Sequence, residues 1–348
     1  TWSTNNLIID SNGNNFQGSP DTYTVDYSTA GQSLSIVYSD ATKGWIPVSD
    51  DAVVNAPVAP PTQKAIFGFG TTGSYTAVTN LVNSSGVVGS DVTGVGTARH
   101  GLAAANFGGD KAIFGYGYSS AARIATTNLV SNEGVVASDT SGVGSVRYHL
   151  AAATYGGDKA IFGYGNTGSM VSITNLVSSS GVVATDTTGV GTARNGLAAA
   201  GYGTDKAIFG YGNGGSDVSM TNLVNNSGVA AADVTGVGTA RDQLSAAGYG
   251  GDKAIFGYGI GGSSTATTNL VNNSGVVAAD VSGVGTAREY LAAASYGSDK
   301  VVFAYGHTGS LSSLKNLVNN SGVVASDVSG VGTARYLVAA AGYGTDKA

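Results

Sequence analysis

The chain has 348 residues, of which 42% are hydrophobic and 11% are charged, and its formal net charge is −6. This composition is too apolar for a disordered chain, and the acidic balance argues against a surface that follows nucleic-acid phosphates. The chain has no cysteine, which excludes disulfides, thiolate zinc sites and cysteine nucleophiles, and no apolar run reaches the roughly 18–20 residues that span a bilayer as a helix.

The N-terminal segment, residues 1–53, does not share the repeat that follows it. Short apolar or alternating stretches predict four strands, at residues 6–10, 22–27, 33–40 and 44–50. So small a module buries little surface, so we expect it to serve attachment or oligomerisation. A proline-rich linker is expected at residues 54–63. Because the sequence starts at Thr1 without methionine or a signal-like segment, we expect a processed protein or a piece of a longer one.

A segment of about 47 residues recurs from Lys64 to the end of the chain. Its register can be followed on a repeated arginine, found at Arg99, Arg147, Arg194, Arg241, Arg288 and Arg335. A fixed period of this size indicates a propeller or a solenoid, because one such unit cannot bury its apolar face alone.

Each copy divides into four predicted strands, a to d, joined by glycine-bearing turns. In the third copy they are expected at residues 150–154, 159–165, 174–177 and 182–186. Ile161 and Phe162 in strand b point to opposite faces, which is typical of a sheet covered on both sides. The run of alanines in strand a suits an innermost strand that is crowded around an axis.

The two ends of the repeat complement each other. The first copy begins at strand b with Lys64, and the segment after Arg335 supplies a strand a with nothing beyond it. Together they make one blade, so we predict an all-β, six-bladed propeller over residues 64–348, closed by this composite blade. The alternative is a truncated longer array.

An arginine, a small apolar strand and then an apolar strand ending in paired glycines are seen in Arg99–Ala105 and Lys111–Gly117. This pattern resembles the kelch repeat, and all six copies match it. The chain departs from the family because Tyr116 splits the glycine pair and the tryptophan usual late in a kelch unit is missing. Kelch-like oxidases of the copper-radical type need a cysteine crosslinked to tyrosine, which this chain does not have.

The N-terminal segment carries the stretches Asn6–Ile9, Asn12-Gly13, Gly18, Ser33–Tyr38 and Gly44-Trp45. They resemble a small β-module of bacteriophage tail-fibre and other virion proteins. The resemblance implies a virion structural protein that contacts other virion proteins through residues 1–53, forms a homo-oligomer and displays the propeller outward.

The copies differ mainly in two loops, the one after strand b and the one between the repeated arginine and strand a. Because strands alternate in direction, both loops are expected at one side of the disc, as a recognition face. Its aromatic, amide, imidazole and carboxylate groups suit sugar rings. The candidate ligand-binding residues are Tyr118, Tyr148, His149, Asn166, Asp217, Asp242, Glu289, Tyr290, His307 and Tyr336. The alternative is drift of exposed loops.

The repeated charges have a structural explanation. We expect the arginine, as at Arg194, to bind carbonyl groups or a neighbouring carboxylate such as Asp186. The aspartates at Asp91, Asp139 and equivalent positions stand alone, so no metal and no other cofactor is expected. The histidines lie in three different copies without a shared nucleophile motif, so we do not expect an enzyme.

The expected function is that of a non-enzymatic phage virion protein, in a fibre, an appendage or a capsid decoration, whose propeller contacts a host-surface glycan or protein. One alternative is a secreted or surface lectin-like adhesin of a bacterium. Another is a polysaccharide lyase or hydrolase that uses His149 or Glu289.

Overall fold

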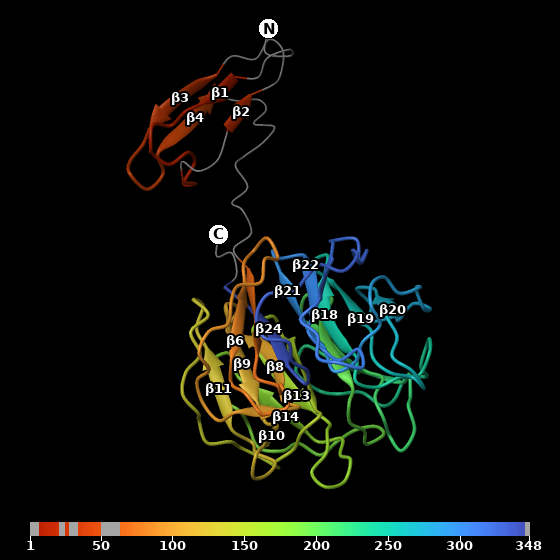
Figure 1. The fold of residues 1–348 in the computed structure, drawn as a ribbon. Helices are drawn as coiled ribbons and strands as arrows, with labels where there is room; N and C mark the ends of the chain where they lie inside the picture. Colours follow the sequence, from red (N-terminus) through yellow and green to blue (C-terminus); the bar gives the residue numbers. More distant parts are fainter. Residues whose placement is uncertain (1–6, 21–24, 28–33, 50–62, 345–348) are drawn as a thin grey trace. The chain divides into compact units, whose positions relative to one another are not determined.

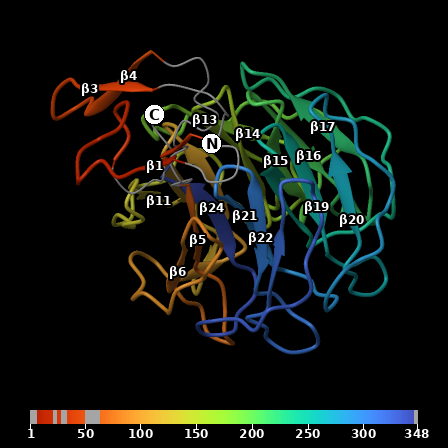
Figure 2. The same cartoon turned by 90° about the horizontal axis from the view of Figure 1, so that it is seen from above.

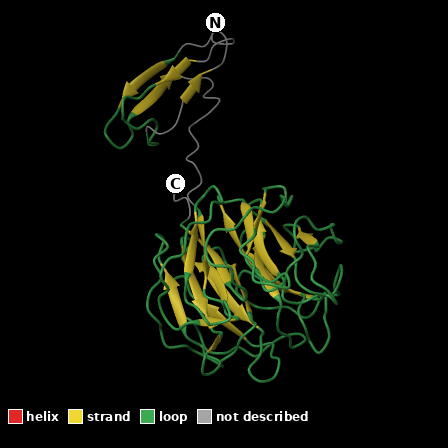
Figure 3. Cartoon of the chain, viewed as in Figure 1, coloured by secondary structure: helices red, strands yellow, loops and turns green. Residues whose placement is uncertain are grey.

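The computed structural model describes residues 7–20, 25–27, 34–49 and 63–344, and these form strands joined by turns and loops (Figure 3). None of the described residues belongs to a helix that could cross a membrane. The chain divides into two compact units, Thr1–Pro61 and Thr62–Ala348. Apart from Gln63, the linker predicted at residues 54–63 lies outside the described residues.

The first unit contains the four strands predicted for it, in two antiparallel pairs. β1 (Leu7–Ile9) pairs with β2 (Val25–Tyr27), and β3 (Ser35–Tyr38) pairs with β4 (Trp45–Ser49). Phe16, only 2% exposed, is the centre of a small apolar cluster in this unit.

The second unit contains six three-stranded antiparallel sheets within residues 63–344 (Figure 1). In each sheet the central strand is strand b of the repeat, flanked by strands a and c. The strands a are β8 (Ala103–Phe107), β12 (Ala151–Tyr155), β15 (Ala198–Tyr202), β18 (Ser245–Tyr249), β21 (Ala292–Tyr296) and β24 (Ala339–Tyr343). The strands b are β9 (Lys111–Gly115), β13 (Lys159–Gly163), β16 (Lys206–Gly210), β19 (Lys253–Gly257), β22 (Lys300–Ala304) and β5 (Lys64–Gly68). The strands c are β11 (Thr127–Val130), β14 (Thr174–Val177), β17 (Thr221–Val224), β20 (Thr268–Val271), β23 (Lys315–Val318) and β6 (Thr79–Val82).

The prediction of a fourth strand in each copy is wrong. In the third copy the segment after β14 forms only single bridges, Val177 with Val183 and Thr174 with Thr187. Between them the side-chain amide of Asn175 donates to the carbonyl of Ala184 at 3.0 Å. A side chain therefore occupies the position of a backbone donor, and the regular ladder is interrupted.

The sixth sheet combines the two ends of the repeat. β24 pairs with β5 from Ala339 opposite Gly68 to Tyr343 opposite Lys64, and β5 pairs with β6. Each strand a also contacts the strand a of the next sheet, and β24 contacts β8 of the first. Figure 2 shows β24 beside β5 and β21, with the other sheets following in chain order. No single sheet closes on itself within the described residues, since each has only two or three strands.

Two series of backbone hydrogen bonds join the sheets, and both are closed. In the first, one residue that precedes each strand a donates its N–H to the carbonyl of the equivalent residue in the preceding copy, at 2.7–3.2 Å. They are Gly101, His149, Gly196, Gln243, Tyr290 and Leu337, and the N–H of Gly101 completes the series by donating to Leu337. In the second series, a glycine of each a–b turn donates its N–H to the carbonyl of an aspartate in the next turn, beginning with Gly108 and Asp158. The composite sheet completes this series, because Gly297 donates to Gln63 at 2.8 Å and Gly344 donates to Asp110 at 2.7 Å.

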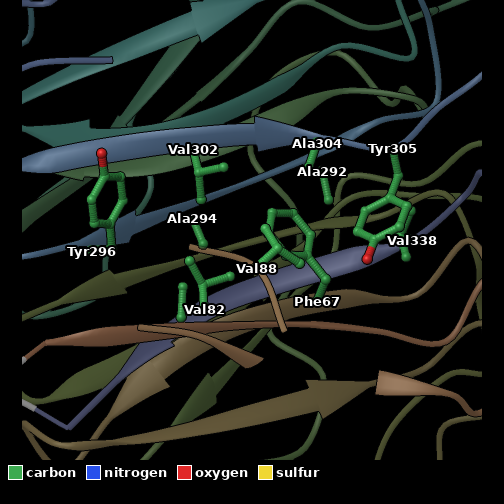
Figure 4. Close-up of a cluster of buried hydrophobic side chains, with 11 residues drawn as sticks. Phe67, Val82, Val88, Ala292, Ala294, Tyr296, Val302, Ala304, Tyr305 and Val338 are labelled. Atoms are coloured by element: carbon green, nitrogen blue, oxygen red, sulfur yellow. The ribbon is translucent and has the colours of Figure 1, made fainter. Parts of the chain in front are cut away.

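The core lies between neighbouring sheets. Ile161 and Phe162 are both fully buried but belong to different clusters on the two faces of their sheet, as predicted. Figure 4 shows the cluster between the last continuous sheet and the composite one, where Phe67 meets Tyr305 edge-on at 5.3 Å. Because burying an Ile–Phe pair contributes about 3–6 kcal/mol, this packing stabilises each sheet against its neighbours.

The repeated arginine binds carbonyls, as predicted, but its predicted carboxylate partner is wrong. Arg194 donates to the carbonyl of Tyr211 at 2.8 Å, and its Nη1 lies 3.7 Å from Asp233, not beside Asp186. Asp186 lies 3.7 Å from Arg147 instead. The reason is that each arginine leads into its own sheet, and the aspartate that follows strand c of that same sheet reaches it.

Candidate binding face

The two variable loops of each copy are joined by backbone pairing. A residue of the loop after strand b is bridged to a residue just before a strand a in every one of the six sheets. The pairs are Tyr118 with His100, Asn166 with Tyr148, Asn213 with Asn195, Ile260 with Asp242, His307 with Glu289 and Thr71 with Tyr336. Both loops therefore lie at the same end of the strands.

We call this end the variable face and define it by four positions in each copy. The innermost position is the closed hydrogen-bond series that begins at Gly101, and the next two are the bridged pairs. A further bridge adds the outermost position, occupied by Tyr75, Arg123, Met170, Asp217, Ser264 and Leu311. The inner residues all have positive φ, from 51° to 61°, which turns the chain sharply at the axis.

Aromatic rings from three copies meet on one side of the variable face. Tyr75 and His100 are 4.7 Å apart between ring centroids, and His100 lies 5.8 Å from Tyr118. Tyr118 lies 5.5 Å from Tyr148, which lies 4.4 Å from His149. These distances are those of interacting rings, so the five side chains form one continuous aromatic surface.

The aromatic surface continues across the ring of inner residues. The ring of His149 is 6.2 Å from that of Tyr290, and Tyr290 lies 5.7 Å from Tyr336. Tyr336 is in turn 5.6 Å from His307. The contact between His149 and Tyr290 thus joins residues that stand 141 positions apart in the sequence.

The two histidines nearest the axis are held neutral. Burial, and to a smaller extent the charge of His100, lowers the pKa of His149 to about 4, and burial also lowers the pKa of His100. His149 is therefore almost wholly deprotonated at pH 7 and a poor general acid. Its Nε2 and the Nδ1 of His100 are shut off from solvent and have no hydrogen-bond partner among the described residues.

Carboxylates gather in another part of the variable face. Burial, followed by the charges of Asp217 and Glu289, raises the pKa of Asp242 to about 6. Gln243 donates to the Asp242 carboxylate at 3.2 Å. Glu289 lies 3.6 Å from His307, measured from Oε1 to Nδ1. None of the three carboxylates pairs with a lysine or arginine among the residues that the structure describes.

A small cavity lies beside the inner residues of the variable face. A cavity of about 70 Å³ is lined by the inner residues and by the leucines or valine that follow them, such as Leu102 and Val338. At the other end of the strands a larger cavity of about 250 Å³ is lined by strand a alanines and by polar side chains, including Asn106 and Lys206. Alanines from all six strands a line a further cavity of about 110 Å³.

All ten candidate residues lie on the variable face, and the structure divides them into an aromatic part and a carboxylate part. Asn166 lies beside Tyr148 through their backbone bridge. Sequence reasoning missed Tyr75 and Arg123, which occupy the same outer position as the candidate Asp217. Extending the comparison between copies by a few residues along the loop would have found both.

The described residues contain no group of three or more His, Asp or Glu side chains arranged to hold a metal ion. The aspartates after strand c have structural partners, since Asp139 accepts from Thr97 at 2.9 Å and from Asn128 at 2.9 Å. Aromatic planes next to amide and carboxylate groups are suited to binding, because they offer stacking surfaces and hydrogen bonds together.

Comparison with known proteins supplies no relative, since neither a protein-family model nor a curated protein sequence matches the chain.

Proposed function

We propose that residues 64–348 form a six-bladed kelch-like β-propeller whose variable face is a non-enzymatic binding surface for a glycan. Two closed hydrogen-bond series and the composite sheet support the propeller, because an open array would leave unpaired edges at both ends. The kelch-like order of arginine, strand a and strand b is repeated in every copy.

The observation that carries the proposal is where the copies differ. Val87, Val182 and their four equivalents are 55–66% exposed, yet all six are valine. Exposure alone therefore does not make a position variable in this chain. The paired loops of the variable face differ in all six copies, and a recognition surface explains that difference better than drift.

The side chains of the variable face fit a sugar ligand. A sugar ring offers one apolar face, which stacks on aromatic planes, and hydroxyl groups, which bond to carboxylates, amides and imidazoles. The continuous surface from Tyr75 to His307 supplies the planes, and Asn166, Asp217, Asp242 and Glu289 supply the polar groups.

We further propose that the protein is a phage virion component, in which residues 1–53 attach the propeller to other virion proteins as part of a homo-oligomer. The resemblance of the N-terminal segment to a virion module supports this, as does the small core around Phe16. The second candidate is a bacterial surface adhesin, which would use the same face.

A glycan array and a cell-binding assay with the full chain test the binding role. Replacing Tyr148 by alanine is expected to remove most binding, because it interrupts the aromatic surface between Tyr118 and His149. Lys159→Gln is the control, since Lys159 lies at the a–b turn, at the other end of the strands. Equal binding by both variants would contradict the proposal. Immunogold labelling of phage particles, against labelling of bacterial surfaces, separates the two candidates.

A further inference from the structure

We propose that the part of the variable face around Arg123 binds the carboxylate of an acidic sugar. This Arg123 sector consists of Tyr75, His100, Tyr118, Arg123, Tyr148 and His149. The inference rests on the proposed function and names the class of sugar that the face prefers.

Arg123 differs from every other arginine of the chain. The other six stand at the repeated position, where they are fully buried and bonded within their sheets. Arg123 lies in a variable loop, and among the described residues it makes no ion pair and no side-chain hydrogen bond. Its charge is therefore left for a partner from outside the described chain.

Unpartnered polar atoms concentrate in the same sector. The described residues contain five enclosed side-chain atoms without a hydrogen-bond partner, and three of them are His100 Nδ1, Arg123 Nε and His149 Nε2. The other two belong to repeated arginines. Because an enclosed polar atom without a hydrogen bond has lost its hydration without replacement, a ligand group that pairs with these atoms gains stabilisation.

The surrounding rings fit a sugar that carries this carboxylate. The guanidinium carbon of Arg123 lies 5.4 Å from the centroid of the Tyr148 ring, so the charge sits beside an aromatic plane. Tyr118 is adjacent at 5.5 Å from Tyr148. A carboxylate on the guanidinium would bring the attached sugar ring over these two tyrosines.

The chemistry of the groups selects an anion. The planar guanidinium presents parallel N–H donors that match the two oxygens of a carboxylate. Burial lowers the pKa of both His100 and His149, so the imidazoles are neutral and each offers one donor and one acceptor to a hydroxyl group.

The test compares oligogalacturonate with its carboxyl-reduced form, which has the same ring and linkage but no charge. Calorimetry with the full chain is expected to show at least tenfold tighter binding of the acidic form. Arg123→Gln is expected to remove that preference while leaving the binding of the reduced form within twofold. Arg123→Lys retains part of the preference, because it keeps the charge but loses the bidentate geometry. Lys159→Gln, at the a–b turn, leaves both affinities unchanged.

The outcomes separate the two proposals. Equal binding of the two oligomers, or equal weakening of both by Arg123→Gln, overturns the carboxylate assignment. The proposed function stands even then, provided that Tyr148→Ala abolishes the binding of a neutral glycan. Preference for a sulfated glycan that has no carboxylate over the carboxylated glycan also overturns the assignment. Absence of binding to every glycan overturns both proposals.

Discussion

Removing one repeated arginine tests how the sheets are held together. The Arg194 side chain is fully buried and donates to the carbonyl of Tyr211 at 2.8 Å, to the carbonyl of Thr192 at 3.1 Å and to Oδ1 of Asn222 at 2.6 Å. It also lies 3.7 Å from Asp233. Arg194→Met keeps much of the apolar stem but deletes all of these contacts.

The expected loss is about 3–5 kcal/mol of unfolding free energy, because buried acceptors lose a charged donor and remain without a substitute. Urea unfolding followed by circular dichroism measures it. Asn222 is fully buried, and its amide also donates to the carbonyl of Ala231 at 3.0 Å and to Asp233 at 2.9 Å, so Asn222→Leu is destabilising by itself. The double variant Arg194→Met, Asn222→Leu is expected to lose less than the sum of the two single losses, because both single variants delete the same Arg194–Asn222 bond. If the free-energy losses of Arg194→Met and Asn222→Leu simply add in the double variant, this reasoning is contradicted.

Other positions in the chain provide matched comparisons. Arg147 lacks a partner for its Nε, so Arg147→Met is expected to cost about 1 kcal/mol less than Arg194→Met. Lys159→Met changes an exposed side chain whose ion pair spans 3.9 Å, and it is expected to stay within about 0.5 kcal/mol of the parent. A loss below about 1 kcal/mol for Arg194→Met would refute the structural role of the arginine.

Three more predictions concern closure, pH and packing. Deleting residues 339–348 removes β24 and leaves β5 with an unpaired edge, so the protein is expected to aggregate on size-exclusion chromatography, whereas deleting only residues 345–348 leaves it monodisperse. Because the pKa of Asp242 is raised in the folded state, that state holds a proton which the unfolded state releases, so the contribution of Asp242 to stability falls as pH rises from about 4 to 6. Asp242→Asn is therefore expected to increase the free energy of unfolding by roughly 1–2 kcal/mol at pH 7 and to leave it unchanged at pH 4. Urea titrations at the two pH values measure this difference. Gly165 has a φ of 102°, and a Cβ there would lie 2.9 Å from the carbonyl oxygen of Tyr148, so Gly165→Ala is expected to cost about 1–3 kcal/mol. Gly89→Ala, at a position where the other copies have alanine, is expected to cost nothing, and equal thermal midpoints for the two variants would show that the backbone at Gly165 is not tightly constrained.

Much of the fold could be predicted because its signals are local and repeated. Strands b and c were located within a residue or two from apolar runs bounded by glycine turns. The pairing of β24 with β5 followed from two incomplete copies at the ends of the repeat. The predicted strand at residues 182–186 is wrong because a side chain, Asn175, interrupts its ladder, and strand propensity does not report a bond between a side chain and a carbonyl nine residues further along.

The candidate site was predictable only in part. Comparison between copies identified the variable loops and therefore which end of the strands carries the differences. It did not reveal that Tyr75 of one copy lies against His100 of another, because such contacts depend on the distance between neighbouring sheets. It also assigned Arg194 the wrong aspartate, since the choice between two copies depends on how each loop enters its sheet.

The sequence by itself determined the period, the order of strands and the complementary ends, because hydrophobic alternation and turn residues act over a few neighbouring positions. The tertiary structure decided which loops meet at the axis and which polar atoms are enclosed there without partners. Those features depend on the packing of six sheets against one another, and that packing places residues from different copies within a few ångströms.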